Sequence, residues 1–162
     1  MSDDELMAEA GKFRPNLLNF FWRSGVSPFE GEDLVQETYL RLWKYRREYV
    51  PTAKLSTFLF LLARQVRLDA LRRDTRRERR EKFWGSGRSD VQEAFPAGER
   101  EDVRRAVAML PDPMREVVEL GVFQDLPYAE VAEILEIPVG TVKSRMFNAM
   151  RKLKEMLDDK GS

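Results

Sequence analysis

The sequence predicts an all-α protein of two small helical domains joined by a linker, the second domain containing a helix-turn-helix. Apolar residues recur at helical spacing in both halves, and no stretch shows the alternating pattern of a strand. Glycine and proline are sparse, at 9 and 8 of 162 residues, but several of them lie between residues 85 and 98. We therefore expect domains at residues 1–75 and 102–162, with a linker at residues 76–101.

The first domain is predicted to consist of helices separated by short breaks. An apolar cluster at helical spacing opens it, and its members are Phe13, Leu17, Leu18, Phe20 and Phe21. Breaks follow at residues 25–28 and at Gly31. An amphipathic helix is expected from Glu32 to Arg47, delimited by Pro51, with an inward stripe of Val35, Tyr39, Leu42 and Trp43. Residues 56–73 predict a further helix, apolar at first and then strongly basic.

The second domain is predicted to end in the helix-turn-helix. A short helix at residues 128–135 is followed by a turn at residues 136–138 and by a second helix from about Val139. The inward face of this second helix is expected to be Val142, Met146, Ala149, Met150 and Leu153. Its outward face holds Thr141, Lys143, Ser144, Arg145, Asn148 and Lys152.

The composition argues against an enzyme. The chain has no cysteine and no histidine, which excludes thiol catalysis and removes the commonest zinc ligands. We expect no catalytic site, no metal site and no cofactor. No apolar run approaches the roughly 20 residues of a membrane span, and the acidic start is unlike a signal peptide. The sequence therefore predicts a soluble cytoplasmic protein with no membrane insertion of its own.

The charges are unevenly distributed, although the formal net charge is zero. Residues 64–82 carry nine bases against four acids, and residues 139–154 carry five bases and no acid. Two basic segments in an otherwise acidic chain predict two separate contacts with a polyanion such as nucleic acid. Solvated helix faces would give the same charge pattern, so the charges alone leave both interpretations open.

The helix-turn-helix gives the second of these segments a mechanism. A recognition helix needs an apolar back that packs on its partner helix and a polar face that meets DNA. Arginine and lysine bond guanine edges, asparagine bonds adenine, and serine and threonine bond phosphate. The candidate DNA-binding residues are Thr141, Lys143, Ser144, Arg145 and Asn148. The alternative is an ordinary helical hairpin with a basic outer face.

Residues 138–145 (PVGTVKSR) closely resemble the start of the recognition helix in region 4 of extracytoplasmic-function sigma factors. Residues 110–111 (LP), 115–118 (REVV) and 128–135 (YAEVAEIL) also resemble that region. The resemblance implies a domain that binds the minus-thirty-five promoter element. Glu136 stands where the family usually has a turn glycine, so a left-handed backbone there would carry a modest cost.

The first domain resembles region 2 of the same family. Residues 32–43 (EDLVQETYLRLW) resemble region 2.2, which implies that Asp33, Gln36, Glu37 and Arg41 bind the clamp coiled coil of the polymerase β′ subunit. Residues 55–73 (LSTFLFLLARQVRLDALRR) resemble regions 2.3 and 2.4, which read and open the minus-ten element. The implied DNA-binding residues are Ser56, Thr57, Arg64, Gln65, Arg72 and Arg73. Most small sigma factors have asparagine at the position of Gln65, and the housekeeping tryptophan pair is replaced by Leu61 and Leu62.

The resemblance implies a sigma factor that binds core RNA polymerase and directs promoter-specific transcription initiation. Its implied partners are core polymerase, through the β′ clamp coiled coil and the β flap, promoter DNA, and an anti-sigma factor. Two alternatives remain: a helix-turn-helix regulator without stable polymerase association, and an adaptor or anti-sigma-like interaction protein. The first leaves the helices at residues 32–47 and 56–73 without a role, and the second does not need the basic residues of the recognition helix.

Overall fold

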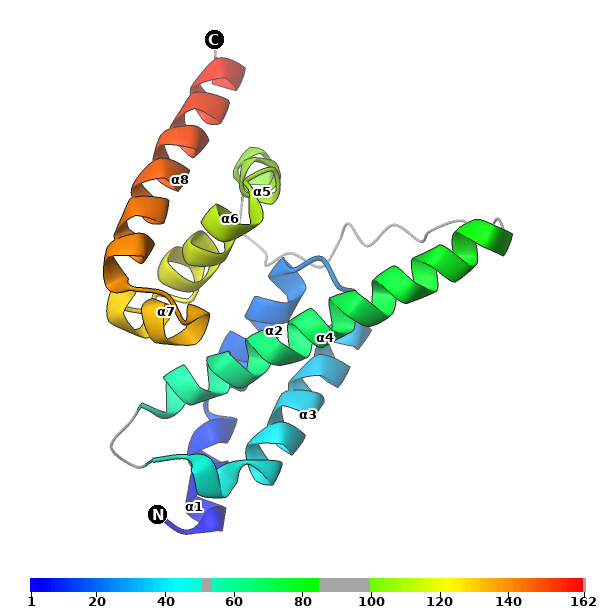
Figure 1. Cartoon of the computed structure of the whole chain (residues 1–162), viewed down its shortest axis with the longest axis vertical. Helices are drawn as coiled ribbons and strands as arrows, with labels where there is room; N and C mark the ends of the chain where they lie inside the picture. The colour runs from blue at the N-terminus through cyan, green and yellow to red at the C-terminus, as the bar shows by residue number, and fades with distance from the viewer. Residues whose placement is uncertain (51–53, 85–99, 162) are drawn as a thin grey trace. The chain divides into compact units, whose positions relative to one another are not determined.

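The computed structural model describes residues 1–50, 54–84 and 100–161, and the side chains of residues 1–50, 54–74 and 100–158. These residues are helical and contain no strand, as the sequence predicts (Figure 1). The chain divides into two compact units, Met1–Phe95 and Pro96–Ser162, called unit 1 and unit 2. Residues 76–84 of the linker predicted at residues 76–101 are helical, and its residues 85–99 lie outside the described residues.

The described residues of unit 1 form four α-helices: α1 (Asp3–Gly11), α2 (Arg14–Arg23), α3 (Pro28–Lys44) and α4 (Leu55–Trp84). A short 3-10 turn, η1 (Arg46–Glu48), follows α3. Two serine caps begin α1 and α3, because the Ser2 hydroxyl accepts from the Glu5 amide and the Ser27 hydroxyl from the Glu30 amide. Pro28 occupies the first position of α3, where its missing N–H costs no helical hydrogen bond.

The connection from α2 to α3 confirms one predicted break and corrects another. Gly25 has a φ of 91°, a conformation that suits glycine, and separates the two helices. Gly31, which we expected to interrupt the chain, lies buried inside α3. A Cβ atom there would be 2.5 Å from the Trp22 indole nitrogen, so glycine serves the close approach of α2 to α3.

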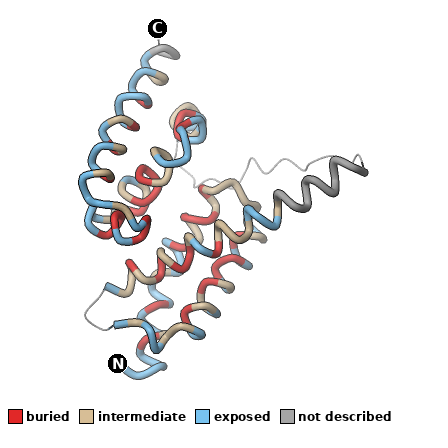
Figure 2. Tube along the Cα trace, in the orientation of Figure 1, coloured by how far each residue is buried: buried red, intermediate tan, exposed pale blue. Residues whose placement is uncertain are grey.

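The core of unit 1 lies where α3 and α4 pack against α1 and α2 (Figure 2). One cluster joins α1, α3 and α4 and consists of Leu6, Ala10, Leu42, Leu59 and Leu62. The rings of Phe20 and Phe60 meet edge to face at 5.6 Å and join α2 to α4. Full burial of one such side chain stabilises the fold by roughly 1.5–3 kcal/mol, so these contacts hold the helices in one arrangement.

Helix α4 is longer than the expected helix at residues 56–73, since it begins at Leu55 and continues to Trp84. Its buried face belongs to its first half and includes Leu59, Ala63 and Val66. The basic segment begins at Arg64, before the last of these buried residues. One helix therefore carries both the apolar packing face and the start of the basic segment.

Unit 2 contains α5 (Glu101–Ala108), α6 (Asp112–Val118), a π-helical turn η2 (Glu119–Phe123), α7 (Tyr128–Leu135) and α8 (Val139–Gly161). Helices α7 and α8 begin at the residues that the sequence predicts. The core of unit 2 comes from all of these elements and includes Val107, Val117, Leu120, Ile134 and Val142.

The turn between α7 and α8 uses a left-handed residue. Glu136 has φ 57° and ψ 46°, and the Ile137 amide donates to the Ala132 carbonyl at 3.0 Å. This is the hydrogen bond of a Schellman cap, whose left-handed position is usually glycine. Because Glu136 is left-handed, the turn carries the modest free-energy cost that the sequence analysis expects for a glutamate at this position.

We predict that Gly31→Ala destabilises unit 1. Inserting a methyl group between packed helices costs about 1–3 kcal/mol, which exceeds the roughly 0.5–1 kcal/mol that alanine gains in a helix. Tryptophan fluorescence during urea unfolding measures this, because Trp22, Trp43 and Trp84 all lie in unit 1. The matched control is Gly11→Ala, where a Cβ would meet nothing within 4 Å and no loss is expected. An unchanged midpoint for Gly31→Ala would show that the Trp22 contact is not tight.

We predict that Glu136→Gly stabilises unit 2. Glycine adopts the left-handed conformation without the Cβ clash, so the free energy of unfolding should rise by about 1 kcal/mol. Hydrogen exchange of unit 2 amides in the full chain provides the measurement. Glu133→Gly, the same substitution inside α7, should instead lower stability by about 1 kcal/mol. Faster exchange in the Glu136 variant would mean that the glutamate side chain stabilises the turn.

Candidate functional site

The first candidate surface is a groove of about 530 Å³ on unit 1, called the α3 groove. It is lined by Met7, Arg14, Glu32, Asp33, Gln36, Tyr39, Leu40 and Trp43. The Tyr39 hydroxyl donates to the Ala10 carbonyl at 2.9 Å, which ties α3 to α1 beneath the groove. An ion pair between Arg14 and Glu32 lies on its lining. The groove thus combines apolar side chains with this exposed ion pair and with two further exposed polar residues, Asp33 and Gln36.

The inward orientation expected for Trp43 is wrong. Its side chain is 44% exposed, and Leu40, one turn before it, is 59% exposed. The Arg46 guanidinium lies 3.9 Å from the centre of the Trp43 ring, a cation–π contact that covers part of the indole at the surface. The buried positions of α3 are Gly31, Leu34, Val35, Thr38 and Leu42. Trp43 projects about 100° around the helix from Leu42 and therefore lies beyond the edge of this buried stripe.

The four predicted polymerase-binding residues do not share one environment. Asp33 and Gln36 line the α3 groove. Arg41 turns toward α4 instead, where its Nη2 donates to the Asp69 carboxylate at 2.7 Å, and its Nε donates to Glu37 at 3.3 Å. The hydrogen bond from Arg41 holds the pKa of Asp69 below its ordinary value. Arg41 therefore belongs to a contact between α3 and α4, and Glu37 pairs with Arg41 within α3.

The second candidate surface is the exposed side of α4. Gln65 and Arg72 are both exposed and lie seven residues apart, which places them on the same side of the helix. Arg73 is also exposed but projects about 100° away, and Arg64 is half-buried. Arg67 is directed inward, with its guanidinium 4.7 Å from the centre of the Phe20 ring. The exposed basic side chains Arg72 and Arg73 thus lie on different sides of α4, and the exposed polar residue Gln65 shares a side with Arg72.

The two hydroxyl residues at the start of α4 differ in accessibility. Ser56 is half-buried, whereas Thr57 is 7% exposed and packs in the core. Residues 51–53, which precede α4, lie outside the described residues. The side chains of the basic segment beyond Asp74 lie outside them as well.

The third candidate surface is the outer face of α8. Val142, Met146 and Ala149 are buried against unit 2, while Lys143 and Ser144 are exposed and Thr141, Arg145 and Asn148 are half-buried. Lys143 and Arg145 project about 200° apart around the helix, on opposite flanks of Ser144. Met150, expected to face inward, is 40% exposed, because its position lies at the edge of the apolar stripe.

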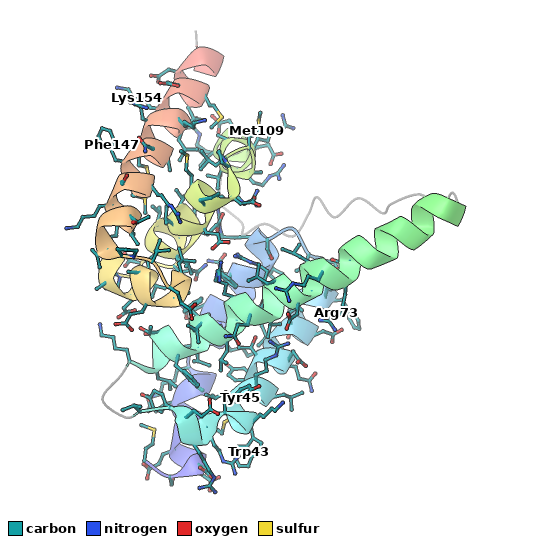
Figure 3. The ribbon with its side chains drawn as sticks, in the orientation of Figure 1. Trp43, Tyr45, Arg73, Met109, Phe147 and Lys154 are labelled. Atoms are coloured by element: carbon teal, nitrogen blue, oxygen red, sulfur yellow. The ribbon has the colours of Figure 1, made fainter. Side chains whose placement is uncertain are left out.

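One residue of this surface was missed by the sequence analysis. Phe147 is 68% exposed and projects from α8 on the side away from α5 and α6 (Figure 3). It follows Lys143 by one turn, so the two side chains are neighbours on the helix surface. The signal was available, because Phe147 falls outside the inward pattern of Val142, Met146 and Ala149.

Within the part of the chain that the structure describes, no group of three or more acidic, histidine or cysteine side chains is placed to hold a metal ion. None of the helices in that part is both long and apolar enough to cross a membrane.

Comparisons with known proteins agree with both units. The family model for sigma-70 region 2 matches residues 10–77, and the model for sigma-70 region 4 matches residues 100–153. The chain is 32% identical to the ECF RNA polymerase sigma factor RpoE of Cereibacter sphaeroides, over 88% of this chain and 81% of that protein. It is 31% identical to the ECF RNA polymerase sigma factor SigK of Mycobacterium ulcerans, over 78% of this chain and 72% of that protein.

Two solved structures share the fold. One is the sigma factor RpoE of Bartonella quintana in complex with the anti-sigma factor NepR, with a TM-score of 0.76, 24% identity and coverage of 95% of this chain and 97% of that chain. The other is CnrH in complex with the cytosolic domain of CnrY, with a TM-score of 0.73, 19% identity and coverage of 98% and 90%. By its matches in both halves, the chain belongs to the ECF RNA polymerase sigma factors, which direct transcription initiation.

Proposed function

We propose that this sigma factor binds core RNA polymerase through the α3 groove, reads the minus-ten element with α4 and reads the minus-thirty-five element with α8. Residues 1–75 form the polymerase and minus-ten domain, residues 76–101 the linker, and residues 102–162 the minus-thirty-five domain. The observation that carries the proposal is the α3 groove, where Leu40 and Trp43 are exposed beside Asp33 and Gln36. Exposed apolar side chains grouped in this way are typical of protein-binding surfaces.

The β′ clamp coiled coil is a suitable occupant of the α3 groove. Helices bind apolar grooves through side chains that recur on one face, and the surrounding polar residues fix their register. Trp43 provides a large apolar anchor of the kind that dominates interface energies. Asp33 and Gln36 supply an acceptor and an amide beside it. Glu37 borders this surface, but its contact with Arg41 makes its contribution secondary.

The minus-ten contacts lie on α4. Arg64, Arg72 and Arg73 bind backbone phosphates, a contribution that weakens as salt rises. Gln65 is the base-reading residue, because its amide has both a donor and an acceptor at an exposed position. Ser56 lies at the start of α4, where its hydroxyl forms a hydrogen bond to a phosphate or to a base of the opened DNA strand. Thr57 is buried, so its side chain is not accessible to DNA in this arrangement.

The minus-thirty-five contacts lie on the first turns of α8. Ser144 and Asn148 lie at the centre of the outer face, with Arg145 and Lys143 on its flanks and Thr141 nearby. Phe147 adds an apolar contact, which suits the methyl group of thymine in the major groove. These side chains give the helix both phosphate and base contacts.

Further partners follow from the family. Unit 2 contacts the β flap of the polymerase. An anti-sigma factor controls the chain, since one of the two similar structures contains the anti-sigma factor NepR and the other contains the cytosolic domain of CnrY. The chemistry of RNA synthesis belongs to the polymerase, and this chain acts in the cytoplasm without being an enzyme. A helix-turn-helix regulator without polymerase association is disfavoured, because it leaves the α3 groove unused.

We predict that Asp33→Ala combined with Gln36→Ala weakens binding to core polymerase by about tenfold or more, since both side chains line the groove and each such interface contact contributes about 1 kcal/mol. A fluorescence titration of the full chain with core polymerase measures the affinity. The matched control replaces an exposed acid and amide outside the groove, Glu48→Ala with Asn16→Ala, and should leave the affinity unchanged. Equal affinities for both double variants would remove the α3 groove from the interface.

We predict that Arg145 and Lys143 contribute differently to minus-thirty-five binding. Arg145 has the fork to bond guanine, so Arg145→Ala should cost about 1–3 kcal/mol at one base and relax specificity there. Lys143→Ala should weaken binding on all sequences and make the salt dependence shallower. Both variants are titrated as holoenzyme against promoters with single base changes at several salt concentrations.

Lys154→Ala is the control for these two variants, because it removes the same charge from a later turn of α8. It should change affinity less than Lys143→Ala. Equal losses for Arg145→Ala on every sequence would exclude base reading by Arg145, and unchanged affinity in all variants would mean that α8 does not enter the groove.

A further inference from the structure

Asp69 is an acid on the helix that we assign to DNA, and it links that helix to α3. One carboxylate oxygen, Oδ2, accepts from Arg41 at 2.7 Å, and the other, Oδ1, lies 3.5 Å from Nη1 of Arg72. The Arg41 side chain is 21% exposed, whereas that of Arg72 is 72% exposed. The network therefore runs from a partly buried arginine on α3, through Asp69, to an exposed arginine on α4.

The position of Asp69 raises an electrostatic problem for DNA binding. A carboxylate near a phosphate backbone repels it, and it also competes with phosphate for the neighbouring guanidinium of Arg72. The short hydrogen bond from Arg41 compensates the carboxylate from the protein side, and it is the first of the causes that lower the pKa of Asp69. Because Arg41 compensates its charge, Asp69 binds Arg72 only weakly, and the distance between Asp69 Oδ1 and Arg72 Nη1 is correspondingly long at 3.5 Å.

We infer that Arg41 is a positioning residue for promoter binding: Arg41 neutralises Asp69, so that Asp69 neither repels DNA nor withholds Arg72 from it, and Arg41 does not itself contact the polymerase. The inference rests on the proposed assignment of α4 to DNA. It also changes the role that the family resemblance implies for Arg41, which the structure places in the contact between α3 and α4.

The two roles of Arg41 predict different double-mutant results. If Arg41 acts through Asp69, losing Arg41 leaves an uncompensated carboxylate that repels DNA and binds Arg72 more strongly. Removing that carboxylate in the same chain then restores DNA binding, because residues in one ion-pair network are not additive. If Arg41 contacts the polymerase, changing Asp69 cannot restore the lost contact.

The test uses the full chain in four forms: wild type, Arg41→Gln, Asp69→Asn and the Arg41→Gln/Asp69→Asn double variant. Two quantities are measured, the affinity for core polymerase without DNA and the affinity of the polymerase-saturated holoenzyme for minus-ten promoter DNA. Arg47→Gln is the matched control, since Arg47 is an exposed arginine on η1. Arg41→Lys, which keeps the charge, tests whether the charge alone suffices, and Arg41→Met, which removes the charge, replaces Arg41→Gln if that variant does not fold.

We expect Arg41→Gln to leave core affinity within about twofold and to lower promoter affinity about three- to tenfold, the range for a partly exposed charge pair. The double variant should recover most of that promoter affinity, Arg41→Lys should retain most of it, and Arg47→Gln should lower it less than Arg41→Gln. An Arg41→Gln variant with weakened core binding that Asp69→Asn does not restore would overturn the inference. Unchanged promoter affinity in Arg41→Gln would also overturn it.

Failure of the proposed function gives a different result. If the Asp33→Ala/Gln36→Ala variant binds core polymerase normally, the α3 groove is not the docking surface, but the promoter measurement at saturating polymerase still tests Arg41 and Asp69. If Arg72→Ala and Gln65→Ala leave promoter binding unchanged, α4 does not bind DNA, and the inference fails together with that assignment.

Discussion

The packing of α3 against α4 is the constraint on which the function of unit 1 depends. Both helices bury an apolar face in the same core, through Leu42 on α3 and Leu59, Leu62 and Val66 on α4. Close-packed cores allow little relative movement, so the outer faces of the two helices are fixed with respect to each other. The proposed polymerase-binding surface and the proposed minus-ten surface are consequently two sides of one rigid body, which suits a protein that must hold DNA at a defined place on its polymerase.

Polar contacts refine this arrangement without creating it. The ion pair between Arg41 and Asp69 joins the same two helices at their surface, and Tyr39 ties α3 to α1 through its hydroxyl. An ion pair near the surface contributes little to stability, typically below about 1 kcal/mol. The pair of Arg41 and Asp69 therefore acts mainly on the charges of neighbouring side chains. Unit 2 follows the same principle, because Val142, Met146 and Ala149 anchor α8 and leave its opposite face accessible for the proposed contact with DNA.

The sequence predicts best those features that depend on local periodicity. The bounds of α7 and the start of α8 follow from apolar spacing and from the turn at residues 136–138, and the structure confirms them. Gly31 was misjudged because glycine signals a break locally, whereas here it accommodates Trp22 from another helix. Trp43 and Met150 were misplaced because hydrophobicity alone does not distinguish a buried residue from one at the edge of a stripe.

The candidate site shows the same division between local and tertiary information. The family resemblance indicated which segments to examine, and the exposed positions of Asp33, Gln36 and Gln65 are compatible with the roles it implies. The pairing of Arg41 with Asp69 could not be read from the sequence, because these residues are 28 positions apart and meet only when α3 packs on α4. Phe147 required the structure to show how far it is exposed.

The central claim is that this single chain gives core RNA polymerase its promoter specificity. Run-off transcription with purified core polymerase over a promoter library, with and without the chain, tests it most directly. The account predicts transcripts that depend on the chain and arise from a subset of templates sharing sequences at the minus-ten and minus-thirty-five positions. Transcripts that do not depend on the chain, or chain-dependent transcripts without any shared promoter sequence, would contradict it.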